Sequence, residues 1–336
     1  MKDLAEYKEN IHSCSKCGLC QSVCPIYKLT GNDCTVSRGH FIMLKGLIKG
    51  DLKMTSKLNR YLDLCLKCGA CTRFCPSGID VVEIIASAKA EYFRTHPLEK
   101  LISLVQRIFL ALLSFKPFGK KKSKKFDKKV IYFSGCKGGS ITKLLNSCGV
   151  EVIEPKFNCC GIPFYVRGDR ENYEKCKNSF IEIIEKYGIK EVVTTCASCE
   201  KTLKGYKIDG LKVRNVFEYI RENELKFELK KLVRVTFHKP CNIENFEDIK
   251  WILENTKNLE YVEMQDFDSC CGLNGVTKLR EYGTMSKLFR AKHKNIVKSG
   301  AKIVLTSCLG CEVSLKLFSL GKYKVVDFSE FINQMV

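Results

Sequence analysis

Eight cysteines in the first quarter of the chain fall into two copies of one motif. The copies occupy residues 14–25 and 65–76, and both read C-x2-C-x2-C-x3-C-P. This spacing is typical of segments that bind a pair of [4Fe–4S] clusters, in which three cysteines wrap one face of a cube and the fourth binds the neighbouring cluster. The proline ends the loop at a position that needs no backbone donor. The paired motif therefore predicts electron-transfer chemistry.

Because the fourth cysteine of each motif binds the other cluster, the eight cysteines are assigned to two cubane clusters. A zinc site is the alternative, but zinc normally uses two C-x2-C pairs separated by a dozen or more residues. The doubled motif does not fit that pattern. The expected ligands of the first cluster are Cys14, Cys17, Cys20 and Cys75, and those of the second are Cys65, Cys68, Cys71 and Cys24.

Ten further cysteines recur between residues 130 and 336 as an internal duplication. Each copy reads Cys…Cys-Cys-Gly…Cys-x-x-Cys, and the copies are about 112 residues apart from the double cysteine onward. This period is too long for a solenoid, so two related domains are expected. The first copy contains Cys136, Cys159, Cys160, Cys196 and Cys199, and the second contains Cys241, Cys270, Cys271, Cys308 and Cys311.

The segments around the first two motifs are expected to be helical. Apolar residues at positions 41, 44, 47 and 48, and again within residues 58–64, follow helical spacing. The spacer between the motifs is also too long for a minimal ferredoxin. These observations predict an α-helical two-cluster ferredoxin domain rather than the β-hairpin type.

The duplicated half alternates short β-branched runs with longer helical patterns. In the first copy the runs lie at 130–134, 150–153, 191–195 and 213–216. Such alternation predicts a parallel sheet with right-handed crossovers in each copy, and ligands bind beyond the carboxyl edge of such a sheet. The five sulfurs of each copy are therefore expected to converge on one rim.

Five thiols are one more than a cubane cluster needs. One cysteine could be spare, a distorted cluster could use all five, or a zinc site could leave one over. A disulfide between adjacent cysteines such as Cys159 and Cys160 would be strained. The residues by themselves leave these alternatives open.

The duplicated pattern resembles the cysteine-rich CCG domains of the heterodisulfide reductase superfamily. Over residues 10–335, including Ser37-Arg38-Gly39 and the stretch 62–68, the chain resembles fused iron–sulfur subunits of that superfamily. These include the subunits of glycolate oxidase, lactate-utilisation enzymes and anaerobic glycerol-3-phosphate dehydrogenase, and the D subunit of heterodisulfide reductase. The resemblance implies that the five cysteines of each copy hold a noncubane [4Fe–4S] cluster, which adds up to two clusters to the two cubanes.

These patterns divide the chain into four parts. They are a helical ferredoxin domain at 1–97, a helical and lysine-rich connector at 98–129, and two α/β CCG domains at 130–231 and 232–336. In the connector, an interrupted apolar stretch precedes a basic run at 120–125. A helix packed between domains is the favoured interpretation, and peripheral contact with an anionic membrane is the alternative.

The net charge and the first residues of the chain bear on two classes, nucleic-acid-binding proteins and secreted proteins. Lys and Arg exceed Asp and Glu by 57 to 37, which gives +20. Because a cluster held by four thiolates is anionic, several clusters would offset much of this excess. No basic stripe interleaved with aromatic residues is present, so no nucleic-acid partner is expected. The first residues contain no apolar signal region, which predicts a cytoplasmic protein, with peripheral attachment to the inner membrane face as the alternative.

Two functions from different classes follow. In the first, a separate FAD-containing dehydrogenase oxidises a 2-hydroxy acid such as glycolate or lactate, and this chain passes the electrons to a quinone or a ferredoxin-like carrier. In the second, the chain itself reduces a disulfide at a noncubane cluster. The first is favoured because relatives of this fused form are so often accessory subunits. No G-x-G-x-x-G follows a strand and no Walker loop occurs, so no flavin site and no catalytic residue is expected in this chain.

Six other residues receive weaker predictions. His238 is expected to donate a hydrogen bond to a cluster sulfur, to act as a proton donor or to serve a structural role at a strand end. Arg167 and Arg170 are expected at a solvated helix start, and contact with an anionic substrate or partner is the alternative. The cysteines outside the motifs are expected to be small buried hydrophobic residues, and they are Cys34, Cys148 and Cys176.

Overall fold

The computed structural model describes residues 1–114, 123–136, 139–273 and 281–336. The basic run expected at 120–125 therefore lies partly outside the described residues. The chain divides into two compact units. Unit 1 consists of Met1–Gln106, Pro163–Tyr173 and Gly272–Arg290, and unit 2 of Arg107–Ile162, Glu174–Cys271 and Ala291–Val336.

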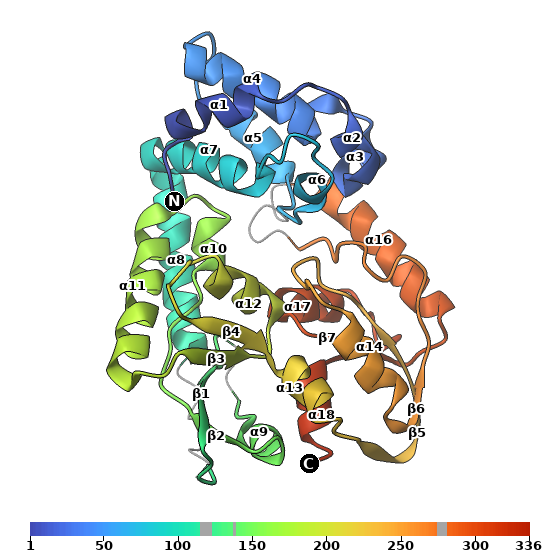
Figure 1. The fold of residues 1–336 in the computed structure, drawn as a ribbon. Coiled ribbons are helices and arrows are strands. Elements are labelled where there is room, and N and C mark those ends of the chain that lie inside the picture. Colours follow the sequence, from blue (N-terminus) through green and yellow to red (C-terminus); the bar gives the residue numbers. More distant parts are fainter. Residues whose placement is uncertain (115–122, 137–138, 274–280) are drawn as a thin grey trace. The chain divides into compact units, whose positions relative to one another are not determined.

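Unit 1 is built from helices throughout its described residues (Figure 1). Its longer helices have clear local signals at their ends. Thr55 Oγ1 accepts a hydrogen bond from the Leu58 amide at 3.2 Å, and Gly50 ends the preceding helix with φ of 83°. The elements are η1 (Leu4–Tyr7), α1 (Lys8–His12), α2 (Leu19–Val23), α3 (Pro25–Thr30), η2 (Asp33–Thr35), α4 (Ser37–Lys49), α5 (Ser56–Leu64), α6 (Ala70–Arg73), α7 (Val81–Thr95), α10 (Ile162–Tyr165) and the start of α8 (Pro97–Ser114).

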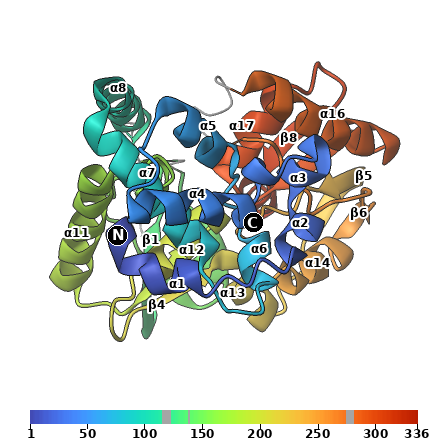
Figure 2. The same ribbon diagram turned by 90° about the horizontal axis from the view of Figure 1, so that it is seen from above.

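The core of unit 1 brings the two cysteine motifs close to each other. Buried Phe41 and Leu44 of α4 pack with Leu62 of α5 and Ile84 of α7, and several motif cysteines lie against this cluster. Helices α2 and α6, which follow the first and the second cysteine loop, lie side by side (Figures 1 and 2). The prediction of an α-helical two-cluster domain is confirmed.

Substitution of Gly39 tests the close packing of α4 against η2. A Cβ atom there would overlap the carbonyl oxygen of Asp33 in η2, whereas a Cβ at Gly283 meets nothing within 4 Å. We expect Gly39→Ala to lower the free energy of unfolding by about 1–3 kcal/mol because the backbone must move apart. Gly283→Ala should leave it unchanged or raise it by up to about 1 kcal/mol. Urea unfolding of both variants checks this, and equal midpoints would contradict it.

Unit 2 contains two parallel four-stranded sheets with the same strand order, β2-β1-β3-β4 and β6-β5-β7-β8. All the strand pairs are parallel, with Tyr132 opposite Val193 in the first sheet and Thr236 opposite Val304 in the second. The first sheet has β1 (Lys128–Phe133), β2 (Val150–Ile153), β3 (Glu191–Thr194) and β4 (Lys212–Asn215), with helices α9 (Thr142–Ser147), α11 (Arg170–Tyr187), α12 (Ala197–Lys204) and α13 (Val216–Glu222).

The second sheet repeats this arrangement, so the prediction of duplicated α/β domains is confirmed. Its strands are β5 (Glu228–Phe237), β6 (Lys257–Tyr261), β7 (Ile303–Thr306) and β8 (Lys324–Asp327), and its helices are α14 (Glu247–Glu254), α16 (Tyr282–Lys298), α17 (Leu309–Leu317) and α18 (Phe328–Asn333). Part of α11 and part of α16 belong to unit 1.

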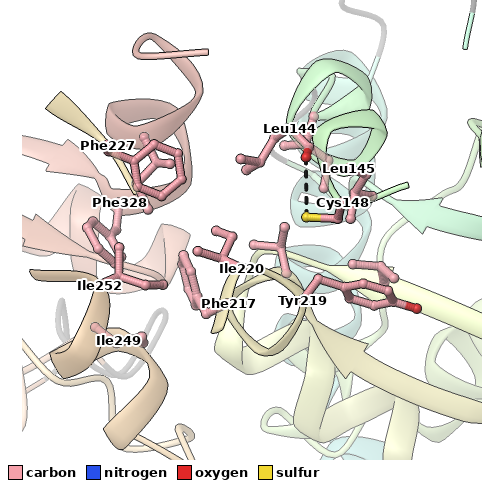
Figure 3. Packing of buried hydrophobic residues seen from close by; sticks show 14 of the residues in the cluster. Leu144, Leu145, Cys148, Phe217, Tyr219, Ile220, Phe227, Ile249, Ile252 and Phe328 are labelled. Carbon is pink, nitrogen blue, oxygen red and sulfur yellow. Dashed lines mark hydrogen bonds between the residues drawn. The ribbon is translucent and has the colours of Figure 1, made fainter. Parts of the chain in front are cut away.

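The two sheets of unit 2 share one hydrophobic core. Phe217 of α13 meets Phe328 of α18 with 5.1 Å between ring centroids, and Ile252 of α14 and Leu144 of α9 belong to the same cluster (Figure 3). Burial of these side chains stabilises the pairing of the repeats, since each large apolar side chain contributes about 1.5–3 kcal/mol. The carboxyl ends of strands from both sheets are thereby held in one unit.

Candidate iron–sulfur sites

The two ferredoxin-type loops have the same unusual backbone. Lys16 and Gly18 in the first loop have φ of 60° and 85°, and Lys67 and Gly69 in the second have φ of 53° and 73°. Glycine adopts this left-handed region without penalty, whereas lysine does so at a cost of roughly 1–2 kcal/mol. Backbone strain of this kind is retained where surrounding structure fixes it, commonly at functional sites. The loops therefore turn tightly, as wrapping a compact group requires.

One set of four cysteines in unit 1 lines a common cavity. Its empty volume is about 380 Å³, part of it open to solvent, and its lining includes Cys24, Cys65, Cys68 and Cys71. Burial raises the pKa of the Cys71 thiol, and the Cys65, Cys68 and Cys24 sulfurs raise it further. Buried thiols of this kind become thiolates when a metal is bound. The donor set and the space fit a [4Fe–4S] cluster.

The structure also explains how Cys24 comes to join three cysteines of the other motif. Cys24 is the N-cap of α3, and Pro25 occupies the first helical position, where no amide donor is needed. Its Sγ accepts a hydrogen bond from the Tyr27 amide at 3.5 Å. This cap turns the sulfur towards the second loop, so that the Cys65 and Cys68 sulfurs act on its pKa, which burial raises to about 11.

The other cysteines of unit 1 gather at the first loop. Burial raises the pKa of Cys20, and the nearby Cys14 and Cys17 sulfurs raise it further. Cys75 follows α6, which packs against α2, the helix that carries Cys20. The eight motif cysteines are thus distributed around two loops, in the arrangement that crossed fourth ligands would need.

The second loop contains a buried lysine, whereas the lysine at the same position of the first loop is exposed. Lys67 is buried and donates from Nζ to the Cys65 carbonyl oxygen at 3.2 Å, whereas Lys16, at the same place in the first loop, is exposed. Burial lowers the pKa of Lys67 to about 8, and the neighbouring Lys89 lowers it further. A cation here favours an anionic group held by the second loop.

The prediction of a solvated Arg167 is wrong. Its guanidinium is buried and pairs with Glu99 at 3.1 Å in unit 1, because a buried charge requires a partner. Among the cysteines outside the motifs, only Cys148 is buried as expected, while Cys34 and Cys176 are half-buried.

In unit 2, the C-x-x-C pairs open helices at the carboxyl edges of the sheets. Cys196 and Cys308 are the N-caps of α12 and α17, which follow β3 and β7, and Cys199 and Cys311 lie in the first turns of these helices. The positive end of a helix dipole favours a thiolate at this position. The local sequence therefore places an equivalent pair of cysteines at the start of a helix in each repeat.

These sites are joined into one continuous row of thiols, which sequence analysis did not predict. Each sulfur lies within hydrogen-bonding reach of the next, and the Cys196–Cys308 contact connects the two repeats. A backbone hydrogen bond from the Ala197 amide to the Ser307 carbonyl, 2.9 Å long, fixes this junction. The row runs in the order Cys136, Cys159, Cys160, Cys199, Cys196, Cys308, Cys311, Cys271 and Cys270. The remaining expected ligand, Cys241, lies half-buried after β5.

Hydrogen bonds along the row lower the pKa of two thiols and raise the pKa of others, among them Cys199 and Cys311. Hydrogen bonds with Cys196 and Cys311 lower the pKa of Cys308 well below its usual range, and the Ser198 hydroxyl, 3.2 Å from its sulfur, lowers it further. Hydrogen bonds with Cys270 and Cys311 do the same for the pKa of Cys271. Thiolate, not thiol, is the metal-binding form. The chemistry of the row therefore fits metal ligation.

Comparison with known proteins also separates a ferredoxin-type part from two cysteine-rich repeats. Residues 10–79 match the 4Fe-4S dicluster domain model, and residues 130–204 and 235–316 match the cysteine-rich domain model CCG. A helix long and apolar enough to cross a bilayer is absent from the part of the chain that the structure describes.

Similar proteins match nearly the whole chain. An uncharacterized iron–sulfur protein of Methanocaldococcus jannaschii is 28% identical over 95% of this chain and 70% of its own length. The glycolate oxidase iron–sulfur subunit of Escherichia coli is 24% identical over 96% and 94%, and the D subunit of the dihydromethanophenazine:CoB–CoM heterodisulfide reductase of Methanosarcina mazei is 24% identical over 91% and 88%. A hypothetical protein from Helicobacter pylori shares the fold, with a TM-score of 0.50 at 12% identity over 99% of this chain and 75% of that one.

Two features together decide the class of protein. The sequence matches place a dicluster domain before two cysteine-rich domains, and the structure gives each the helical or parallel-sheet architecture expected of it. The relatives that carry functional names are subunits of oxidoreductases. The chain is therefore an oxidoreductase iron–sulfur subunit with one 4Fe-4S dicluster domain and two CCG cysteine-rich domains, and it is similar to subunits of glycolate oxidase and heterodisulfide reductase.

Proposed function

We propose that this chain is the electron-transfer subunit of a flavin-linked 2-hydroxy-acid dehydrogenase of the glycolate or lactate type. It accepts electrons from an FAD-containing dehydrogenase subunit and passes them to a quinone or another carrier. The observation that carries the proposal is the gathering of two ferredoxin-type cysteine sets and a nine-thiol row in one chain. The near-complete coverage of the Escherichia coli glycolate oxidase subunit supports this choice.

The cysteines hold the redox groups in this proposal. Bound iron–sulfur clusters supply reversible one-electron transfer. Two cubane [4Fe–4S] clusters are held by the crossed sets of unit 1, and up to two noncubane clusters by the five-cysteine sets of unit 2. Around them the protein excludes water by burying Cys199 and Cys311, and it places Lys67 as a counter-cation. The two predicted CCG domains at 130–231 and 232–336 are the functional modules of this half.

The exposed face of α8 supports peripheral attachment to a membrane, where a quinone acceptor would be available. Leu101, Val105 and Ile108 share one helical face and are 57%, 60% and 52% exposed. Lys100 and Arg107 belong to the same helix, and further lysines follow it in the sequence. An apolar stripe with adjoining basic residues suits the surface of an anionic bilayer.

The test is anaerobic purification of a tagged chain from its native host, separately from soluble and membrane fractions. We expect about one flavin per chain in the eluate, together with about sixteen iron atoms per chain for four clusters. We also expect part of the chain on membranes and its release by high salt, because the attachment is partly electrostatic. A tagged Cys34→Ser variant, altered outside the motifs, serves as the control. An eluate without flavin would overturn the assignment to a dehydrogenase.

Disulfide reduction by the chain itself is the second candidate, and the Cys196–Cys308 junction favours it. The two cysteine-rich repeats meet there, so two redox groups could act on one disulfide. An iron content near sixteen without flavin would favour this function. Reduction of a disulfide with an artificial donor, lost in Cys308→Ser, would then identify the chain as the reductase.

A further inference from the structure

One buried histidine faces the second half of the thiol row. His238 follows the last residue of β5, and its amide donates to the Leu305 carbonyl of β7 at 2.8 Å. Its side chain is 1% exposed and lies beside the Cys271 sulfur. Apart from the Cys271 sulfur, which lies within hydrogen-bonding reach of the ring, the imidazole has no hydrogen-bond partner among the residues that the structure describes. A buried imidazole with one ring nitrogen unpartnered is costly, which indicates that a bound group completes its surroundings.

Three buried hydroxyl groups near the carboxyl ends of β5 and β7 also lack hydrogen-bond partners among the described residues. Thr236 precedes His238, and Thr306 and Ser307 end β7 and follow it. All three side chains are fully buried, and their hydroxyl oxygens lack a hydrogen-bond partner among the residues that the structure describes. Unsatisfied buried polar groups are uncommon in folded proteins, and several of those in the described residues lie at this carboxyl edge. This independent observation also indicates a bound group at the edge of the second sheet.

The distances suit a shared metal ion. A ring nitrogen of His238 and the sulfurs of Cys271 and Cys311 all lie within 4.8 Å of one another, and all three residues are buried. A tetrahedral metal with bonds of about 2.0–2.3 Å to nitrogen and sulfur holds its ligand atoms about 3.5–4 Å apart. Small side-chain movements would therefore bring the three atoms onto one ion.

The first repeat offers no such ligand at the matching position. Ser134 follows the last residue of β1 as His238 follows that of β5, and β1 and β5 occupy the same place in their sheets. A serine hydroxyl is a poor ligand for iron or zinc compared with imidazole. The two repeats therefore differ in the chemistry of their donor sets although their cysteines match.

We propose that His238 is a metal ligand of the second repeat and binds the same ion as Cys271 and Cys311. The inference rests on the proposed function, since the ion is an iron of the group that the second repeat holds.

The test uses the full chain, labelled with 15N-histidine and 57Fe and reconstituted anaerobically with iron and sulfide. Pulsed EPR of the reduced protein should show a 15N coupling of the size found for bound histidine. The coupling should be lost in His238→Ser, which installs the residue of the first repeat, and kept in His12→Ala, which alters an exposed histidine. Mössbauer spectra, which do not require an EPR-active state, should show one iron site per chain that changes in His238→Cys.

The outcomes separate this proposal from the proposed function. Iron near sixteen per chain without nitrogen coupling, or with a coupling that survives in His238→Ser, would overturn the histidine ligand and leave the four clusters in place. Iron near eight per chain without nitrogen coupling would overturn the histidine ligand together with the noncubane clusters of unit 2, whereas the flavin content still tests the proposed function. The spectrum of the wild-type chain by itself shows whether a histidine binds iron. A variant that folds poorly therefore does not leave the proposal untested.

Discussion

Replacing Cys24 with serine is expected to abolish the same cluster as replacing Cys71, and replacing Cys75 the same cluster as replacing Cys20. The reason is the crossed arrangement of unit 1, in which Cys24 caps α3 beside Cys65 and Cys68. Serine is a weak ligand for iron, so each variant should lose about four iron atoms per chain and one of two EPR signals of the reduced ferredoxin domain. Iron analysis and EPR redox titration measure both effects.

The control for this prediction is Cys34→Ser. Cys34 is half-buried and belongs to neither motif, so this variant should keep the full iron content and both signals. A Cys24→Ser variant that loses the signal missing in Cys20→Ser would show that each loop supplies all four ligands of its own cluster. The crossed ligand assignment would then be wrong, although the cluster count would stand.

Asp63→Ala is expected to destabilise the chain by about 3–5 kcal/mol. The Asp63 carboxylate is buried and pairs with the buried ammonium of Lys89, and it also accepts a hydrogen bond from Asn59 Nδ2 at 3.2 Å. Removing it leaves the Lys89 charge buried without its carboxylate partner, and this accounts for most of the loss. Since α5 leads into Cys65, loss of cluster absorbance during urea unfolding is the measurement that reports on this region.

Two further variants show whether charge is the cause. Glu91→Ala breaks an exposed pair with Arg94, 2.9 Å long, and should change stability by less than about 1 kcal/mol. In the double variant Asp63→Ala/Lys89→Met both charges are absent, so part of the lost stability should return. A loss in Asp63→Ala no larger than that in Glu91→Ala would show that the buried pair contributes little.

The positions of the helices and strands could be predicted well from sequence because their signals are local. The β-branched run at 150–153 coincides with β2, and the helical spacing within residues 58–64 falls in α5, because the bounds of both elements depend on short-range propensity. The duplication predicted two sheets of the same kind, and both have the same strand order. Within each cysteine motif, spacing along a tight loop limits which sulfurs can share one group.

The burial of particular polar residues depended on contacts that sequence periodicity does not encode. Lys16 and Lys67 occupy the same motif position, yet only Lys67 is buried. Arg167 was expected in solvent because it precedes a helix, but Glu99, 68 residues away, pairs with it inside unit 1. Neither difference follows from neighbours in the sequence, since both are set by which distant element packs above the side chain.

The sequence by itself therefore determined the cysteine sets, the helical and duplicated α/β domains, and the class of redox protein. Only the tertiary structure decided that Cys196 meets Cys308 and that His238 faces Cys271. The physical reason is that strand and loop signals act over a few residues, whereas these contacts depend on how the two sheets share one core. Packing of Phe217 against Phe328 brings the repeats together, and the thiols at their edges meet as a consequence.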